Sequence, residues 1–246
     1  MSNFAEYSAY YDLLYRDKDY AGEAAYIASL IRGAHPTART VLDLGCGTGK
    51  HAGLLQNLGY DICGVDMSTT MLEEARRTQP AIKFHEGDAR SFRLDQTFDA
   101  VVSLFHVASY QTSNQDFAAY LQTAKSLMAP GGVFIFDFWY GPAVLADPPA
   151  VRVKRLEDGQ LKITRIAEPD HDSLRNIVDV RYQVLIETAK GARQLSESHH
   201  MRYFFLPEIE LFLQNAGMTL HSVKAWKQDR LPTAADWGAC VVAGLA

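Results

Sequence analysis

The stretch of the sequence that most limits the possible folds is residues 40–55, TVLDLGCGTGKHAGLL. A short apolar run, Thr40–Leu44, leads into a loop that contains Gly45, Gly47 and Gly49, and an amphipathic segment follows. A glycine-rich turn between a strand and a helix is typical of open α/β sheets that bind a ligand beyond the carboxyl ends of their strands. The stretch therefore predicts the first strand, the ligand loop and the first helix of such a sheet.

The alternation of strand and helix patterns continues along the chain. After helical spacing in residues 5–33, the pattern predicts strands at 40–44, 61–65, 82–85, 98–104 and 132–136, and helices at 50–58, 70–77 and 116–128. Strands that alternate with helices indicate βαβ units and a parallel, doubly wound sheet.

The pattern changes near Val151. The segments VRVKRL, LKITRIAE, IVDVRYQVLIE and RQLSESHHMRYFF alternate apolar and polar residues, which predicts an antiparallel meander with one face in water. A helical pattern at 207–216 and two strand patterns at 219–226 and 238–244 complete the chain. We expect an α/β fold: a Rossmann-like, doubly wound, mostly parallel sheet with an antiparallel last strand and an inserted antiparallel β-meander.

Three parts of the chain are expected from these patterns. Residues 1–35 would form an N-terminal helical segment that covers the site. Residues 36–140 and 205–246 would form the Rossmann-like core, and residues 141–204 an inserted sheet for substrate or dimer contacts. The chain has 246 residues and is 48% hydrophobic, which suits one large domain with an insertion.

Charge and cysteine content restrict the partners. A net charge of −5 argues against a nucleic-acid partner, because phosphate contacts need a basic surface. Cys46, Cys63 and Cys240 form no CxxC pair, so neither a zinc site nor a disulfide framework is indicated. The N-terminus lacks a signal-peptide pattern, and no apolar run approaches the ~18 residues of a membrane span. We expect a cytoplasmic protein with no metal and no membrane contact.

The glycine loop does not match the loops that bind phosphates. Its spacing is G-x-G-x-G, and Lys50 stands where a dinucleotide fingerprint needs its third glycine. His51 stands where a P-loop needs Ser or Thr. Asp43, just before the loop, would repel a pyrophosphate but suits a ligand's amino group.

Two more carboxylates follow the next two strands. Asp66 ends the second strand in GVDMS, where a carboxylate can bind both ribose hydroxyls, and Asp88 ends the third strand in HEGDAR, where it can meet an adenine edge. Alone, an aspartate such as Asp66, beside Ser68, is more often a helix N-cap, and Asp88 would be a loop residue. Together with Asp43 they describe a ligand with an amino-acid end, a ribose and a base: S-adenosylmethionine (SAM).

The motifs VLDLGCGTG, GVDMS, GDA and LMAPGGVFIF resemble the class I SAM-dependent methyltransferases over roughly residues 38–138. Cys46 is expected to be a packed loop residue and not a nucleophile. From the motifs and the resemblance together, we expect the cofactor contacts to be Tyr20, Asp43, Gly45, Cys46, Gly47, Asp66, Met67, Asp88, Ala89 and Leu104.

A second resemblance extends over most of the chain. The segments YYDLLYRDKDYAGEA, CGTGKH, GDARSF, VVSLFHVASY, DFWYGP and ESHHMRYF are similar to the N,N-dimethyltransferases of nucleotide-linked amino sugars. That resemblance implies that Tyr11 closes over cofactor and substrate and orients the amine. Tyr110 matches a loop histidine that lies near the amine in some relatives, whereas His106 departs from the family pattern.

Methyl transfer to an amine needs a nucleophile at attack distance, exclusion of water and a route for one proton. We expect Tyr110 or His106 to accept or relay that proton, and Tyr20 to bind the methionine carboxylate. Trp139 could line the acceptor pocket, and His199 and Arg202 could bind a sugar nucleotide's pyrophosphate. Each also has a plainer interpretation: the tyrosines and Trp139 as packing, His106 as a buried hydrogen-bonded histidine, and His199 and Arg202 as solvated surface.

The leading hypothesis is a SAM-dependent N-methyltransferase of a nucleotide-linked amino sugar. Three alternatives remain: methylation of another small molecule, such as a sugar hydroxyl or an amino acid amine; SAM binding without transfer; and an NAD-dependent dehydrogenase, which Lys50 and Asp43 disfavour. A homodimer is possible, because the meander strands could pair with a second subunit.

Overall fold

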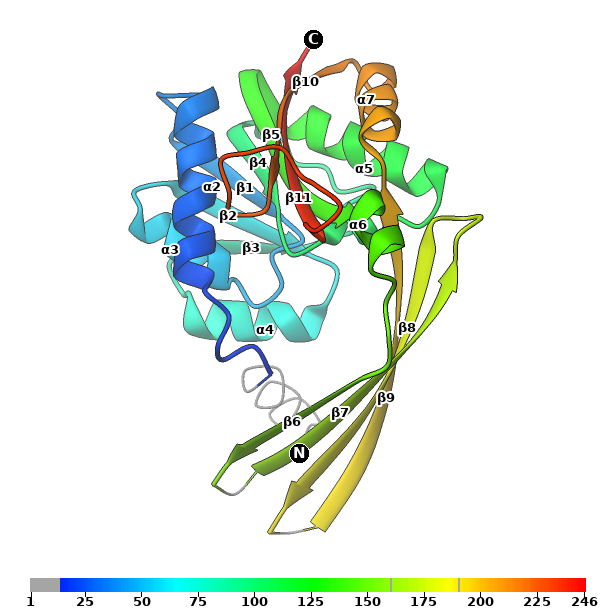
Figure 1. Cartoon of the computed structure of the whole chain (residues 1–246). Coiled ribbons are helices and arrows are strands. Elements are labelled where there is room, and N and C mark those ends of the chain that lie inside the picture. The colour runs from blue at the N-terminus through cyan, green and yellow to red at the C-terminus, as the bar shows by residue number, and fades with distance from the viewer. Residues whose placement is uncertain (1–13, 160, 190) are drawn as a thin grey trace. The chain divides into compact units, whose positions relative to one another are not determined.

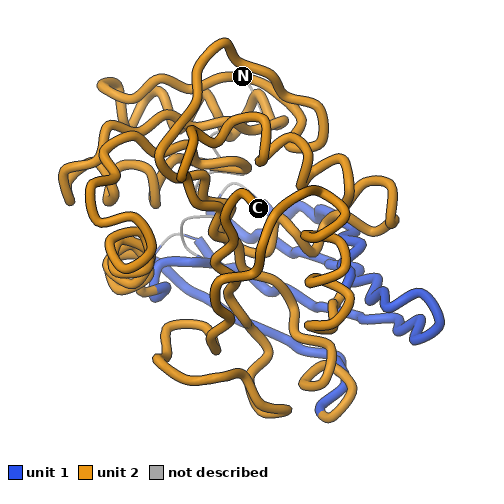
Figure 2. Tube along the Cα trace, turned by 90° about the horizontal axis from the view of Figure 1, so that it is seen from above, with its two compact units in different colours: residues 1–18, 147–202 blue, residues 19–146, 203–246 orange. Residues whose placement is uncertain are grey.

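The computed structural model describes residues 14–246 except residues 160 and 190. It divides into two compact units (Figure 2): one contains residues 147–202 and the described part of the N-terminal segment up to Lys18, and the other contains residues 19–146 and 203–246. The larger unit holds the predicted glycine loop.

The larger unit contains the alternating elements that the sequence predicts (Figure 1). In chain order they are α2 Tyr20–Ala34, β1 Thr40–Leu44, α3 Lys50–Asn57, β2 Asp61–Asp66, α4 Thr69–Thr78, β3 Lys83–Glu86, β4 Phe98–Ser103, the 3₁₀ turn η1 Val107–Tyr110, α5 Asn114–Leu127, β5 Met128–Tyr140, α6 Gly141–Ala146, α7 Leu206–Asn215, β10 Met218–Ala225 and β11 Gly238–Leu245. The expected elements lie within a few residues of their predicted bounds; η1 and α6 were not predicted.

The sheet of this unit has the predicted Rossmann-like order. Parallel pairing gives β3-β2-β1-β4-β5, so the order reverses between β1 and β4, and β11 then pairs antiparallel with β5 and β10 with β11. Such a reversal leaves a crevice at the carboxyl ends of β1 and β4, which is where open α/β sheets bind ligands.

Strand alternation directs side chains into two apolar layers, one on each face of the sheet. Along β1, Val41 packs with α2 and α3, whereas Leu42 and Leu44 pack on the opposite face, among residues of α5 and α7. Asp43 alternates with these residues and therefore points to the layer of α2 and α3. A carboxylate inside an apolar layer is costly unless it is paired or neutral.

Helix ends follow the cap residues in the sequence. Ser68 caps α4 by accepting a hydrogen bond from Met71 N, and Ser113 caps α5 by accepting one from Asp116 N. Gly217 follows Ala216, the C-cap of α7, and has φ = +70°, the left-handed conformation typical of a glycine at this position. These local signals explain why the predicted boundaries hold.

The fifth strand begins earlier than predicted. The sequence predicts a start at Gly132, whereas β5 starts at Met128 and its pairing with β4 shifts register between Phe98 and Ala100. Gly131 has φ = +76° at this irregularity, so the Pro-Gly-Gly turn interrupts the ladder without ending it.

The smaller unit is the predicted antiparallel meander. Its strands are β6 Arg152–Asp158, β7 Leu161–Asp172, β8 Ile177–Thr188 and β9 Gly191–Phe204, each paired antiparallel with the next. Leu14, Ile163, Val184 and Ile186 form a small apolar cluster on one face. The last two residues of β9, Tyr203 and Phe204, belong to the larger unit and pair in parallel with Trp139 and Tyr140.

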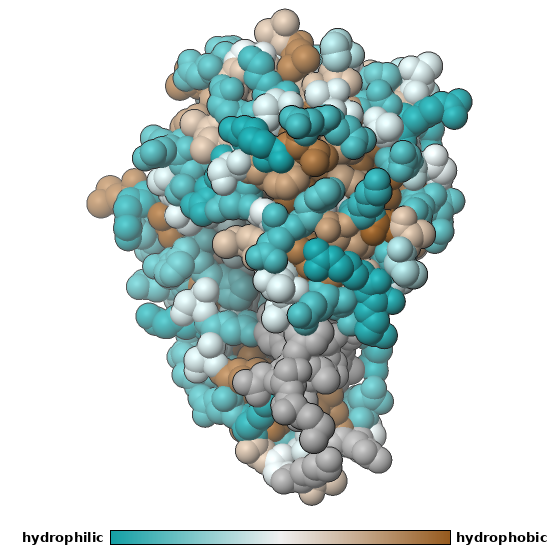
Figure 3. All heavy atoms as spheres, turned by 180° about the vertical axis from the view of Figure 1, so that it is seen from behind, coloured by the Kyte–Doolittle hydropathy of each residue, from teal (hydrophilic) through white to brown (hydrophobic). Residues whose placement is uncertain are grey.

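On the face that Figure 3 shows, hydrophilic side chains predominate and hydrophobic ones appear in groups between them. The large apolar side chains gather in the interior, where Tyr120, Phe117, Phe134 and Phe136 are fully buried. None of the helices in the described residues combines the length and apolar character that crossing a membrane requires.

Candidate functional site

The glycine loop connects β1 to α3 and is tied to the end of β2. Backbone N–H groups of Gly45 and Cys46 donate to Val65 O at 2.7 and 2.9 Å. A Cβ at Gly45 would lie 2.5 Å from Val107 Cγ2, so a side chain there would collide with the loop after β4. A Cβ at Gly47 would meet nothing within 4 Å. The loop therefore packs tightly at Gly45 and leaves its backbone approachable at Gly47.

Asp66 holds this loop from the end of β2. Its Oδ2 accepts a hydrogen bond from Gly47 N at 2.8 Å, and its Oδ1 accepts one from Ser68 N at 2.8 Å. Ser68, and not Asp66, is the N-cap of α4, so the plain capping interpretation of Asp66 is wrong. A carboxylate has about four acceptor positions, so Asp66 retains capacity for ligand hydroxyls.

Asp43, just before the glycine loop, is a buried carboxylate with 1% of its surface exposed. Its Oδ1 has no hydrogen-bond partner in the described part of the chain. Burial raises the pKa of Asp43 to about 7; His51 opposes this shift and Asp66 adds to it. An unpartnered acceptor beside an open loop fits a ligand ammonium, which would supply both the hydrogen bond and the opposite charge.

A buried polar pair connects the helices on either side of β1 in the chain. His51 Nε2 of α3 is 2.7 Å from Glu23 Oε2 of α2, and both residues are buried. The ring of Tyr20 lies 5.1 Å from that of His51, and Lys50 Nζ lies 5.2 Å from the centroid of the Tyr20 ring. The pair joins α2 to α3 and places Tyr20 beside the start of α3.

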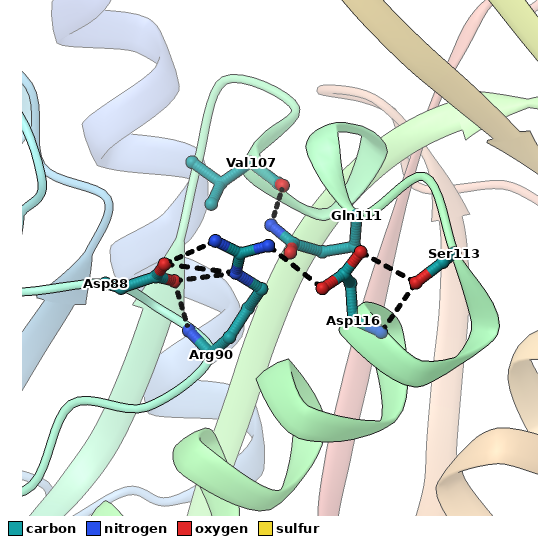
Figure 4. Close-up of polar contacts among 6 residues, drawn as sticks. All are labelled: Asp88, Arg90, Val107, Gln111, Ser113 and Asp116. Carbon is teal, nitrogen blue, oxygen red and sulfur yellow. Dashed lines mark hydrogen bonds and ion pairs between the residues drawn. The ribbon is translucent and has the colours of Figure 1, made fainter.

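Asp88, after β3, is engaged by Arg90 (Figure 4). Arg90 donates to it from its backbone N at 2.8 Å and from Nε at 2.9 Å, and Arg90 Nη1 donates to Asp116 Oδ1 at 2.9 Å. The hydrogen bonds from the Arg90 side chain hold the pKa of Asp88 below its usual range, so its carboxylate is charged at neutral pH. Arg90 therefore links Asp88 to Asp116 in the first turn of α5.

The loop after β4 carries His106. Its backbone N donates to both oxygens of Asp137 at 3.1 and 3.2 Å, and its ring Nδ1 lies 2.7 Å from Asp137 Oδ2. Asp137, on β5, is 1% exposed, whereas 27% of the His106 side chain is exposed. Trp139 lies near by, with its ring 6.2 Å from that of His106, and its backbone N donates to Ser109 Oγ at 3.0 Å.

Comparison with known proteins identifies this arrangement. A family model described as a methyltransferase domain matches residues 41–132. The chain is 32% identical to a dTDP-3-amino-3,4,6-trideoxy-α-D-glucopyranose N,N-dimethyltransferase of Streptomyces venezuelae, with 89% of this chain and 93% of that protein aligned. It is 30% identical to a dTDP-3-amino-3,6-dideoxy-α-D-glucopyranose N,N-dimethyltransferase of Streptomyces fradiae, over 87% and 84% of the two chains.

The chain belongs to the SAM-dependent methyltransferases.

Solved structures agree with this assignment. The crystal structure of DesVI from Streptomyces venezuelae matches with a TM-score of 0.84 and 29% identity, and all of both chains is covered. SAM-bound CalS10, an amino pentose methyltransferase from Micromonospora echinaspora, matches with a TM-score of 0.78 and 26% identity over 96% and 95% of the chains. These matches confirm the predicted fold and the methyl donor, SAM.

Most of the predicted cofactor residues lie along the carboxyl edge of this methyltransferase's sheet. Asp43, Asp66 and Asp88 follow β1, β2 and β3, and Gly45 and Gly47 lie between the first two of these carboxylates. Of the apolar residues, Leu104 is 2% exposed and Met67 69% exposed, while Ala89 is half-buried against the core. Burial raises the pKa of the Cys46 thiol well above its usual value, as expected of a packed residue that is not a nucleophile.

The predicted acceptor residues are distributed differently. His106, Tyr110 and Trp139 lie in the larger unit, on the loop after β4 and at the end of β5. His199 and Arg202 belong to the meander unit. Arg202 is 5% exposed, so the alternative of a solvated surface arginine is wrong for it. Tyr11 lies outside the described residues.

Three partners in the site were missed by sequence reasoning: Asp137, Glu23 and Arg90. Asp137 had a signal, because a carboxylate interrupts the apolar run VFIFDFW near the carboxyl end of a predicted strand. Glu23 and Arg90 had none, since charged residues in a helical pattern or a loop are ordinarily solvated. In the described part of the chain, side chains of histidine, cysteine, aspartate and glutamate form no group of three that could hold a metal ion.

Proposed function

We infer that this methyltransferase transfers methyl groups from SAM to the amino group of a nucleotide-linked amino sugar. The observation that carries the inference is the alignment over 93% of the length of an N,N-dimethyltransferase that acts on a dTDP-3-amino sugar. Relatives that act on a different 3-amino sugar and on a 4-amino sugar align over 84% and 83% of their lengths. The shared chemistry of these substrates is a primary amine on a sugar attached to dTDP.

The described residues offer a site for the donor. SAM supplies an electrophilic methyl group on a positively charged sulfur. Asp43 Oδ1, which has no hydrogen-bond partner among the described residues, would bind the donor's ammonium, and Tyr20, beside Lys50, would bind its carboxylate. Asp66 would take the ribose hydroxyls with its remaining lone pairs. Asp88 and Ala89 would meet the adenine edge, and Met67 and Leu104 would add apolar contacts to the base.

The residues proposed to bind the acceptor are supported by fewer contacts than those proposed to bind the donor. His106 and Tyr110 follow β4 and are partly exposed, so either side chain is accessible to an amine at the carboxyl edge of the sheet. Tyr11 would orient the amine, and Trp139 would line its pocket. His199 and Arg202 would bind the diphosphate of the nucleotide, since an arginine can grip phosphate oxygens with two N–H groups.

A substrate panel tests the proposal. The protein with SAM is incubated with the dTDP-linked 3-amino and 4-amino sugars named for the three relatives, and mass spectrometry follows the products. We expect one or two methyl groups to be added to at least one of these amines. The matched control is the same nucleotide sugar with a hydroxyl in place of the amine, which should remain unmodified. Methylation of the hydroxyl sugar alone would contradict N-transfer.

A further inference from the structure

Two consecutive residues of the loop after β4 have an unusual backbone. Phe105 and His106 both have φ = +65°, the left-handed region that residues with a side chain rarely occupy. Such a conformation is energetically costly and persists only where the surrounding structure holds it, often at functional sites. Here the Asp137 carboxylate does so, because both of its oxygens accept from His106 N at 3.1 and 3.2 Å.

The same carboxylate also contacts the ring of His106. Nδ1 lies 2.7 Å from Asp137 Oδ2, an ion-pair distance that falls outside hydrogen-bond geometry; the carboxylate is 1% exposed, whereas 27% of the histidine side chain is exposed. The buried carboxylate therefore lies beside Nδ1 of a histidine whose side chain is partly exposed.

Two groups that stay neutral lie near Asp137 in the described residues. Cys240 lies directly opposite it on β11, and Tyr120 approaches from α5. Burial raises the pKa of both groups well above their usual values, and Asp137 raises each further, so both stay neutral. Among the described residues, two aromatic rings lie near the His106 ring: that of Phe105, with ring centroids 5.8 Å apart, and that of Trp139.

A carboxylate at Nδ1 determines which ring nitrogen can accept a proton. Neutral histidine carries one N–H, and a carboxylate partner favours the tautomer with the proton on the nitrogen that faces it. Nδ1 of His106 would then be protonated, and Nε2 would carry the free lone pair. Tyr110, the other proton acceptor expected from the sequence, is 46% exposed, and a phenol is a poor base at neutral pH.

We propose that Asp137 is a positioning residue that fixes His106 with Nε2 free as the proton acceptor of methyl transfer, an inference that rests on the proposed amine acceptor. In this step the neutral amine attacks the methyl carbon. The C–N bond forms while the S–C bond breaks, and its electron pair stays on sulfur. The proton released from the methylated nitrogen passes to His106 Nε2.

The tautomer can be tested without turnover. Long-range ¹H–¹⁵N spectra of the full chain bound to S-adenosylhomocysteine report which nitrogen of each neutral histidine carries the proton, and the signal missing in His106→Gln assigns His106. We expect protonation at Nδ1 in the wild type and its loss in Asp137→Asn. A wild-type His106 protonated at Nε2 would overturn the proposal.

Kinetics separate positioning from a structural role. With whichever dTDP-amino sugar the wild type methylates, His106→Gln should lower kcat by about 10²-fold or more, the range of general-base contributions. Asp137→Asn should lower kcat at least about 10-fold with little change in acceptor KM, and should lower it no further when combined with His106→Gln.

A matched control carboxylate lies at the opposite edge of the sheet. Asp99 Oδ2 also accepts backbone N–H bonds, from Arg39 and Thr40. Asp99→Asn should lower the melting temperature and leave kcat unchanged. If Asp137→Asn lowered kcat by the same factor in the wild type and in the His106→Gln variant, Asp137 would have a structural role and the proposal would be overturned. A wild type that methylates none of the amino sugars would contradict the proposed function, while the spectra would still decide the tautomer.

Discussion

Asp66 Oδ2 accepts a hydrogen bond of 2.8 Å from the backbone N–H of Gly47. The residue expected to bind the cofactor ribose is therefore also the residue that holds the glycine loop in place. Cofactor affinity should therefore depend on Asp66 in two ways: through its contact with the ribose and through its hydrogen bond to the glycine loop.

Replacement of Asp66 tests this double role. Asp66→Ala should weaken binding of S-adenosylhomocysteine by about 1–3 kcal/mol or more, because ligand hydroxyls and the Gly47 N–H lose their acceptor together. Isothermal titration calorimetry measures the affinity. Glu86→Ala is the matched control, since Glu86 ends β3 opposite Asp66 but is exposed to solvent. Affinity that is equal in the wild type and Asp66→Ala would remove Asp66 from the cofactor site.

The loop glycines should respond differently to alanine. Gly45→Ala should lower the free energy of unfolding by more than Gly47→Ala, because its Cβ would lie 2.5 Å from Val107 Cγ2. Gly47→Ala should cost about 1–2 kcal/mol through its left-handed backbone alone, yet should strongly weaken cofactor binding. Urea unfolding and calorimetry measure the two effects.

A helical glycine provides the control for these two variants. Gly33 lies in α2, and a Cβ there would meet nothing within 4 Å. Gly33→Ala should therefore stabilise the protein by roughly 0.5–1 kcal/mol and leave cofactor binding unchanged. If Gly47→Ala proved less stable than Gly45→Ala, the argument that a Cβ at Gly45 collides with Val107 would be wrong.

Asp43 predicts a pH dependence of stability in the cofactor-free protein. Its pKa is raised from 3.8 to about 7 by burial, so between these values the folded state binds a proton that the unfolded state has released. Stability from this group is therefore lost as the pH rises from about 4 to above 7, by a total on the order of 4 kcal/mol. Urea unfolding at pH 5.5 and pH 8 should show the decrease.

Asp43→Asn provides the comparison, because it is nearly the same size and does not titrate. The loss of stability between pH 5.5 and pH 8 should be smaller in this variant than in the wild type. Equal slopes in the two proteins would mean that Asp43 is already charged at pH 5.5. The variant should also bind S-adenosylhomocysteine more weakly, because the ammonium loses its ion-pair partner.

The Asp88–Arg90 contact allows a test of the adenine contact. Asp88→Ala should weaken binding of S-adenosylhomocysteine but barely change binding of the inosine analogue, which lacks the 6-amino group that a carboxylate would accept from. Arg90→Ala should cost about 1 kcal/mol of stability or less, because 41% of its side chain is exposed and surface ion pairs contribute little. Equal losses of affinity for both ligands in Asp88→Ala would indicate that Asp88 acts only through Arg90.

Local patterns explain what could be predicted. Thr40–Leu44 forms β1 with the predicted bounds, because a short apolar run before a glycine loop specifies its own ends. The cofactor residues could be placed because each follows a strand directly, and parallel strands bring their carboxyl ends to one edge. The predicted start of β5 at the Pro-Gly-Gly turn was wrong, because where β5 begins depends on its pairing with β4 across a bulge.

The order of strands and helices, the glycine loop and the three carboxylates that indicate SAM can be predicted from the chain alone, because periodicity and turn chemistry act over a few residues. The side chains that hold these groups follow from the three-dimensional packing. Asp137 reaches His106 because β4 and β5 are neighbours in the sheet, and Glu23 reaches His51 because α2 packs against α3. Such partners lie far apart in the chain, and packing rather than sequence spacing sets their contact.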